Sequence, residues 1–249
     1  MKPRLLRVAC LAMATSAMLS APVLAQDAET TADTDAPRGM FVLDVGTSGY
    51  RGFDRLVMAD YVKAAGGDSA ALERLLGACA EAIEVDAENA EALAWRGAAR
   101  MFEAGAASDS GDMMAAMTHV NKALADLARA GSLEMDNPGV RIIAAQTLLV
   151  LAQNHPIEQM AKGYATQGIE HATAGLASLH GNWGAQPIAL KGRLMSDVAA
   201  AHERLGEPNK ARDWYNRVIG AVPGSVWAQQ AQAKIDAMDA AADREARSL

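Results

Sequence analysis

The residue types that carry most enzyme chemistry are present, but their spacing does not assemble a catalytic or metal site. The five histidines of the 249-residue chain stand apart, at His119, His155, His171, His180 and His202. No two of them have the short helical spacing that places two metal ligands on one helix face. Paired acids such as Glu81 and Glu84 fall on polar helix faces, and no serine, histidine and acid form a local triad. We therefore expect no metal, no cofactor and no enzymatic activity.

One glycine-containing segment has residues that could bind phosphate. Residues 42–49, VLDVGTSG, resemble the first phosphate loop of the sugar kinase and actin-like ATPase superfamily, in which glycine amides hold phosphate. That fold requires a β-hairpin directly afterwards and two large α/β domains, whereas Asp54 opens a helical pattern here. A motif needs its structural context. We therefore favour an extended leader over residues 39–53, which packs Met40 and Phe53 against the first helices.

The N-terminal residues have the three parts of a secretory signal peptide. Basic residues come first, an apolar run extends from Val8 to about Leu19, and a small-residue cleavage site ends at Ala25. We predict a cleaved signal over residues 1–25 and a mature start near Gln26. A retained anchor is the weaker alternative because the apolar run is shorter than the roughly 20 residues of a membrane span. Lipidation at Cys10 is also weaker, because this cysteine precedes most of the apolar run.

Charge and cysteine content indicate an acidic, exported protein without disulfides. Signal cleavage removes three basic residues and no acidic one, which changes the formal net charge from −7 to −10. Bulk attraction to nucleic acid or to an anionic membrane is therefore not expected. Cleavage also removes Cys10 and leaves Cys79 unpaired, so stability must come from packing. We expect a periplasmic protein, without stable membrane insertion, in which residues 26–38 form a disordered acidic linker.

The rest of the chain has the composition and periodicity of an all-α protein. Aromatic residues make up only 4% of the chain, and alanine recurs at helical spacing. Glycine, proline and Asx residues separate the apolar patterns. The predicted helices cover residues 54–65, 69–85, 90–104, 112–130, a stretch from 138, 157–179, a stretch from 187, one that ends at 222, and 225–241. The segment 106–111 is predicted to be a turn, and residues 242–249 a flexible tail.

A repeating unit is clearest between Met195 and Pro223. Two apolar helical patterns meet there at the turn 205–209. Before the turn, four residues have the spacing W-x2-L-G-x2-Y, and after it a small residue, an aromatic residue and a proline follow at fixed distances: Met195, Val198, Ala199, His202, Ala211, Tyr215 and Pro223. This unit resembles the tetratricopeptide repeat, whose period is about 34 residues. Methionine, alanine and histidine replace the tryptophan, glycine and tyrosine of the family pattern.

The resemblance implies an irregular solenoid of helical hairpins over residues 54–241, closed by a C-terminal capping helix with a polar outer face. Weaker copies of the second-helix spacing occur three times earlier, and one of them contains Cys79. In that position Cys79 is expected to be a buried, small apolar residue. His202 is expected to be packed and hydrogen-bonded, and Tyr215 to be a packing residue.

In tetratricopeptide proteins the first helix of each pair usually lines a groove. Four arginines lie on such helices here: Arg96, Arg100, Arg141 and Arg193. They could be solvated on exposed faces, or they could form a basic lining that binds carboxylates, which arginine contacts through two parallel hydrogen bonds. The leading hypothesis is a non-enzymatic exported scaffold that binds a protein or acidic peptide in the periplasm or cell envelope. The alternative is a carrier of small organic acids or a transporter accessory protein.

Overall fold

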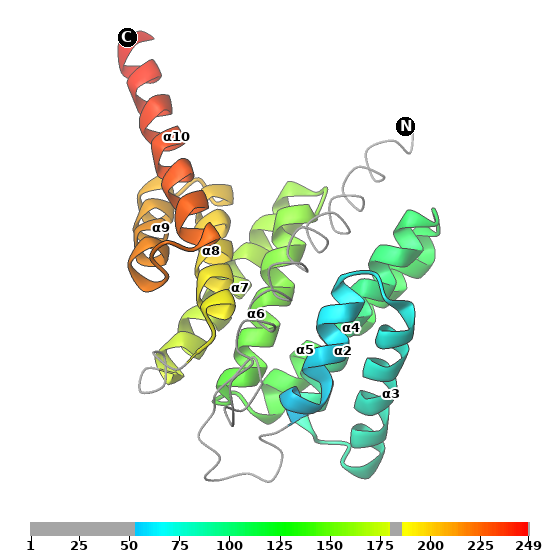
Figure 1. Ribbon diagram of the computed structural model, residues 1–249. Coiled ribbons are helices and arrows are strands. Elements are labelled where there is room, and N and C mark those ends of the chain that lie inside the picture. The colour runs from blue at the N-terminus through cyan, green and yellow to red at the C-terminus, as the bar shows by residue number, and fades with distance from the viewer. Residues whose placement is uncertain (1–52, 180–185, 249) are drawn as a thin grey trace.

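The computed structural model of the protein describes residues 53–179 and 186–248 (Figure 1). Regular structure in this part of the chain is entirely helical, which confirms the all-α prediction there. The nine helices of the described residues are α2 (Phe53–Ala65), α3 (Ser69–Val85), α4 (Ala90–Asp109), α5 (Met113–Leu133), α6 (Pro138–Asn154), α7 (Glu158–Ser178), α8 (Ile188–Arg204), α9 (Pro208–Ala221) and α10 (Val226–Ser248). The predicted signal peptide, the linker, residues 39–52 of the leader and the turn at 180–184 lie outside the described residues.

Four of the described helices, α3 to α6, start directly after an Asx residue. The side chains of Asp68, Asn89 and Asp112 accept hydrogen bonds from the backbone N–H three residues on, at 2.9–3.0 Å. Asn137 does the same for Gly139 and Val140 at the start of α6. Each such cap stabilises a helix by about 1 kcal/mol. The local sequence thus fixes these four boundaries.

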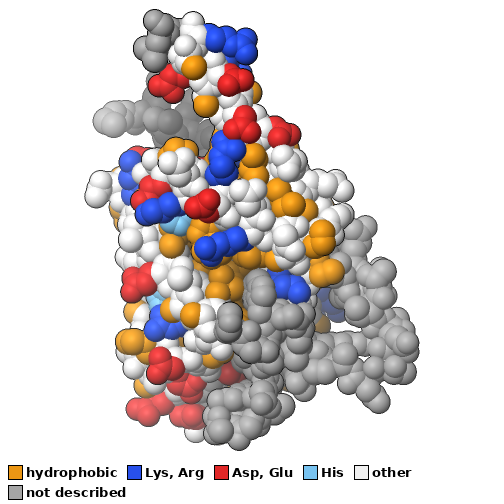
Figure 2. Space-filling view, turned by 90° about the vertical axis from the view of Figure 1, so that its left-hand side faces the viewer, with side chains coloured by type: hydrophobic (Ala, Val, Ile, Leu, Met, Phe, Trp, Pro, Cys, Tyr) orange, Lys and Arg blue, Asp and Glu red, His pale blue; other side chains and the backbone are white. Residues whose placement is uncertain are grey.

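Three helices continue further than the sequence pattern predicted, and α5 does so by three residues, to Leu133. The prediction of a turn at 106–111 is wrong for its first four residues, because alanine-rich α4 continues to Asp109 and buries Ser108. The chain reverses instead at Gly111, whose φ of 86° favours glycine, and Asp112 then caps α5. Helix α10 continues beyond Ala241 to Ser248, and its exposed end carries acidic and basic side chains (Figure 2).

The helices pack in a regular order along the chain. Each described helix contacts the next one, and the even-numbered helices also contact each other in series, α2 with α4, α4 with α6, α6 with α8 and α8 with α10. Figure 1 shows α2–α5 together at one end of the molecule, α6 and α7 in the middle and α8–α10 at the other end. An even-numbered helix between two others is therefore covered on more sides than its odd-numbered neighbours. This order brings the even-numbered helices into one row.

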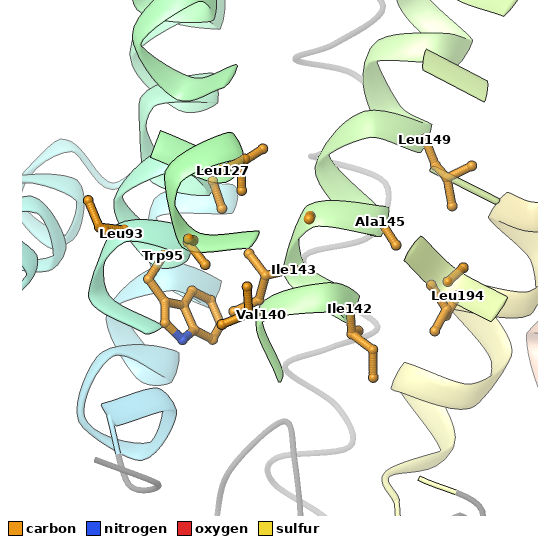
Figure 3. Packing of buried hydrophobic residues seen from close by; sticks show 14 of the residues in the cluster. Leu93, Trp95, Leu127, Val140, Ile142, Ile143, Ala145, Leu149 and Leu194 are labelled. Carbon is orange, nitrogen blue, oxygen red and sulfur yellow. The ribbon is translucent and has the colours of Figure 1, made fainter. Parts of the chain in front are cut away.

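Burial follows that order. Helix α6 is buried around most of its circumference, as its continuous apolar sequence predicted, whereas α9 buries only a single stripe of Ala211, Tyr215 and Val218. The larger core cluster joins α2 to α8 and includes the fully buried Trp95, which lies beside Val140 and Ile143 (Figure 3). A smaller cluster joins α8, α9 and α10.

None of the helices in the described part of the chain combines the length and apolar character that crossing a membrane would require.

Candidate ligand site on the even-numbered helices

The predicted arginines Arg96 and Arg100 lie together on α4, and both bind one carboxylate of α5. Arg96 donates two parallel hydrogen bonds to Asp126, from Nε to Oδ2 at 2.8 Å and from Nη2 to Oδ1 at 2.7 Å. Arg100 donates to Oδ2 of the same residue from its Nη1. Asp126 is almost fully buried, while both arginines are about one fifth exposed. These contacts tie α4 to α5, and they use much of the donor capacity of both arginines.

Arg141 lies at the start of α6 and donates from Nε to the carbonyl of Met135, across the turn that precedes the helix. Its positive charge acts on His171 of α7. Burial lowers the pKa of His171, and the nearby Arg141 lowers it further. The structure does not place Arg141 in the network around Asp126.

Arg193 lies on α8 and forms a looser ion pair. Its Nε is 3.5 Å from Oδ2 of Asp197, one helical turn further on, and the two side chains are 23% and 15% exposed. The other carboxylate oxygen, Oδ1, accepts a hydrogen bond of 3.1 Å from Nε2 of Gln153 on α6. Beyond this contact with Arg193, Oδ2 has no hydrogen-bond partner within the described part of the chain. Burial raises the pKa of the Asp197 carboxyl, and this effect exceeds the lowering by Arg193 and Gln153.

An aromatic group on α2 and α4 lies within electrostatic reach of this pair. The ring of Tyr61 on α2 is 5.1 Å from the rings of both Trp95 and Phe102 on α4, in edge-on and tilted arrangements. Burial raises the pKa of Tyr61, Arg193 lowers it and Asp197 raises it, so the phenol senses both charged groups of α8. Tyr61 on α2 thus lies within electrostatic range of α8, although the two helices are more than 120 residues apart in sequence.

We define the inner site as Tyr61, Phe102, Gln153, Arg193 and Asp197, which come from α2, α4, α6 and α8. Arg193 has five N–H donors, and its ion pair with Asp197 is the contact that holds it among the described residues, so it can bind an anion. Oδ2 of Asp197 is buried against Arg193, and Tyr61 and Phe102 offer apolar ring surface. Within the described residues no group of three or more His, Cys, Asp or Glu is placed to hold a metal ion.

Two other residues that could carry chemistry, Cys79 and His202, are buried in the fold. Cys79 is fully buried, and burial raises the pKa of its thiol to about 12, which keeps it protonated. His202 is buried, with Nδ1 at 2.7 Å from Oε2 of Glu207 at the turn between α8 and α9. The predictions of a buried Cys79 and a packed, hydrogen-bonded His202 are both confirmed.

Of the inner site, sequence analysis found only Arg193. Tyr61 was visible as part of an apolar helix stripe, and Gln153 carried no signal. Asp197 did carry a sequence signal. An acid four residues after an arginine, inside an otherwise apolar helix, indicates a charge pair on a buried face.

Comparison with known proteins gives no match: no family model, no curated protein and no solved structure matches this chain.

Proposed function

We propose that this protein is a non-enzymatic scaffold of tetratricopeptide-like helical hairpins that binds a partner at the inner site. The observation that carries the proposal is the convergence of Tyr61, Gln153 and the Arg193–Asp197 pair from three even-numbered helices. Three elements far apart in sequence supply polar and aromatic groups to one region, as binding sites in helical repeats do. The loose contact of Arg193 leaves donors for a carboxylate.

The order of packing supports the hairpin architecture. Each helix pairs with the next, the even-numbered helices lie in series, and α10 packs on both α8 and α9. Such an order is typical of a helical solenoid with a terminal capping helix. The predicted signal peptide places this scaffold in the periplasm or cell envelope, with a protein or acidic peptide as its partner.

A carrier of small organic acids is the second candidate, and the enclosure of the inner site favours it. The side chains of Arg193 and Asp197 are less than one quarter exposed. A long peptide needs an open surface, whereas a small acid or a chain terminus can reach a partly buried arginine. Both candidates therefore use the same carboxylate-binding residue.

The test measures binding to the protein purified from an expressing bacterial host. Thermal shift against acidic peptides, peptides with free C-termini and small organic acids should identify stabilising ligands, since a ligand at 100 times its Kd adds about 2.7 kcal/mol. Arg193→Gln should weaken the best ligand, while Arg244→Gln, a change on the exposed end of α10, should not. Equal affinity for the wild type and Arg193→Gln, or no ligand in any class, would overturn the proposal.

A further inference from the structure

Three methionines lie on one side of the start of α5. Met113, Met114 and Met117 belong to the first five residues of this helix. An α-helix turns by about 100° per residue, so the three side chains fall within an arc of about 100°, with Met117 between the other two. Residues three and four apart on a helix are neighbours, with Cβ atoms about 5–6 Å apart. The three thioether groups are therefore placed to meet at one point.

The cluster is open to solvent. Met114 and Met117 are 83% and 63% exposed, and Met113 is partly buried. The hydroxyl of Ser108, near the end of α4, donates to Sδ of Met113 at 3.8 Å and holds this side chain beside α4. A methionine side chain has three rotatable bonds, so the two exposed sulfur atoms can turn toward Met113. An ion from solution can reach the cluster without any opening of the fold.

The apolar surface around the cluster is short. Asp109 and Asp112, which precede Met113, are exposed, and so is the polar Asn121, one turn after Met117 on the same side of the helix. A helix that docks into an apolar groove carries anchors over at least two turns, at positions i, i+3, i+4 and i+7. The methionine cluster ends after little more than one turn. Its extent therefore suits a single small ligand better than a partner helix.

The chemistry of the thioether group indicates which ligand. Thioether sulfur is a soft ligand that selects Cu(I), whereas carboxylate and carbonyl oxygens suit harder ions. The positive N-terminal end of a helix disfavours a cation, and the negative charges of Asp109 and Asp112 offset this effect. The expectation of no metal was based on the spacing of histidines and acids, and thioethers are a separate class of ligand.

We propose that Met113, Met114 and Met117 bind one Cu(I) ion, with their three thioether sulfur atoms as its ligands. None of these residues belongs to the inner site, so the inference does not depend on the proposed binding function. Cys79, the other soft ligand in the described part of the chain, is fully buried and cannot meet an ion from solution in the folded protein.

The experiment uses the purified full chain with carbon-13 in the methionine methyl groups, and Ag(I) as a redox-stable substitute for Cu(I). Silver nitrate in chloride-free buffer should shift the NMR signals of Met113, Met114 and Met117 and saturate at one ion per chain. Met135 and Met160 are 62% and 44% exposed but have no other methionine within four residues, so their signals should not move. Equal shifts of all exposed methionines, or no shift at all, would overturn the inference.

Variants identify the ligands. In Met114→Leu/Met117→Leu, the Met113 signal should need about tenfold more Ag(I) or higher, since even the loss of a group that supports a metal ligand has an effect of this size. Leucine and methionine have similar volumes, and both positions are exposed, so circular dichroism should be unchanged. An unchanged Ag(I) titration in this variant would show that the cluster is not the site.

Two further variants are the controls. Met135→Leu/Met160→Leu removes two exposed methionines outside the cluster and should bind Ag(I) like the wild type. Cys79→Ala should also keep the methyl shifts. Loss of these shifts in Cys79→Ala would assign the ion to the thiol and overturn the inference. Cu(I) itself, titrated without oxygen against a Cu(I) chelator, should rank the variants in the same order as Ag(I), and a different order would also contradict the proposed ligands.

Discussion

At the scale of single residues, Asp197 is the group whose surroundings suit it least. It is a carboxylate on a buried helix face, with one oxygen bonded to Gln153 and the other held only by the looser 3.5 Å contact with Arg193. Ion pairs that are well buried often cost more in desolvation than they return in attraction. Proteins retain such groups where binding needs them, at some loss of stability. The stability of an Asp197 variant is therefore informative independently of any ligand.

Asp197→Asn should raise the melting temperature at neutral pH. The folded-state pKa of Asp197 lies above its unfolded value. The stability that the fold gains from a protonated Asp197 is therefore fully present below the unfolded pKa. It is lost as the pH rises through the folded pKa. The advantage of the asparagine variant should therefore grow as the pH is raised from about 4, the ordinary value of an aspartate. Melting curves across that range measure it. A melting temperature below that of the wild type at neutral pH would mean that the pair with Arg193 stabilises the fold on balance.

Tyr215 should contribute mainly through packing. It is 3% exposed in the cluster between α8, α9 and α10, and its hydroxyl donates to Oε1 of Glu203 at 3.2 Å. Tyr215→Ala should cost about 3 kcal/mol of unfolding free energy. Tyr215→Phe should cost about 1 kcal/mol, because Lys234 still binds Glu203. Urea unfolding distinguishes the two, and equal losses would show that the hydroxyl dominates.

At the scale of helices, the arginines of α4 act between elements rather than on a ligand. Asp126→Ala leaves Arg96 and Arg100 without their shared carboxylate, and it should cost about 3 kcal/mol, as for other broken buried pairs. Asp60→Ala is the matched control, because it breaks the exposed pair with Arg74 and should cost at most about 1 kcal/mol. Chemical unfolding of both variants gives the comparison. Similar small losses would leave Arg96 and Arg100 free for a binding role.

Close contact between α8 and α10 depends on a residue without a side chain. A Cβ atom at Gly192 would lie 2.6 Å from the ring of Trp227, which no ordinary contact allows. Gly192→Ala should therefore displace Trp227 and lower the melting temperature. Gly163→Ala on α7 meets no atom within 4 Å and should stabilise the helix by about 0.5–1 kcal/mol. Trp227 fluorescence should shift in the first variant only. An unchanged spectrum would argue against this contact.

Helix positions could be predicted from the sequence because caps and periodicity are local. Asn89 and Asn137 mark the starts of α4 and α6, and Gly66 follows the last residue of α2. The end of α4 was harder to predict, since Ala106 and Ala107 suit a helix as well as a loop of small residues. The inner site was not predictable in the same way. Tyr61 comes within electrostatic range of Asp197 only because four helices pack in series, and nothing near either residue in sequence encodes that approach.

At the scale of the whole molecule, the nearest-neighbour order of packing limits how far a local change spreads. Each described helix contacts its neighbours along the chain, and each even-numbered helix also contacts the adjacent even-numbered helices. Stability in such an arrangement is close to a sum of unit and interface contributions. The inner site is different, because it needs α2, α4, α6 and α8 in register. Binding should therefore be more sensitive to distant damage than the fold itself is.

Removal of α10 tests whether stability is lost locally and whether binding is more sensitive to distant damage than the fold is. Deletion of residues 226–249 takes Ala231 and Ile235 out of the cluster that contains Met195 and Tyr215, so it should lower the melting temperature markedly and expose apolar surface. Deletion of residues 242–249 alone removes residues that are exposed wherever the structure describes them, and it should change the melting temperature by no more than about 2 °C. In the long deletion α8 loses its outer support, so ligand binding at Arg193 should weaken even at temperatures where circular dichroism still shows a folded protein. If the long deletion melts and binds like the wild type, α10 is not a capping helix and the nearest-neighbour description of this fold is wrong.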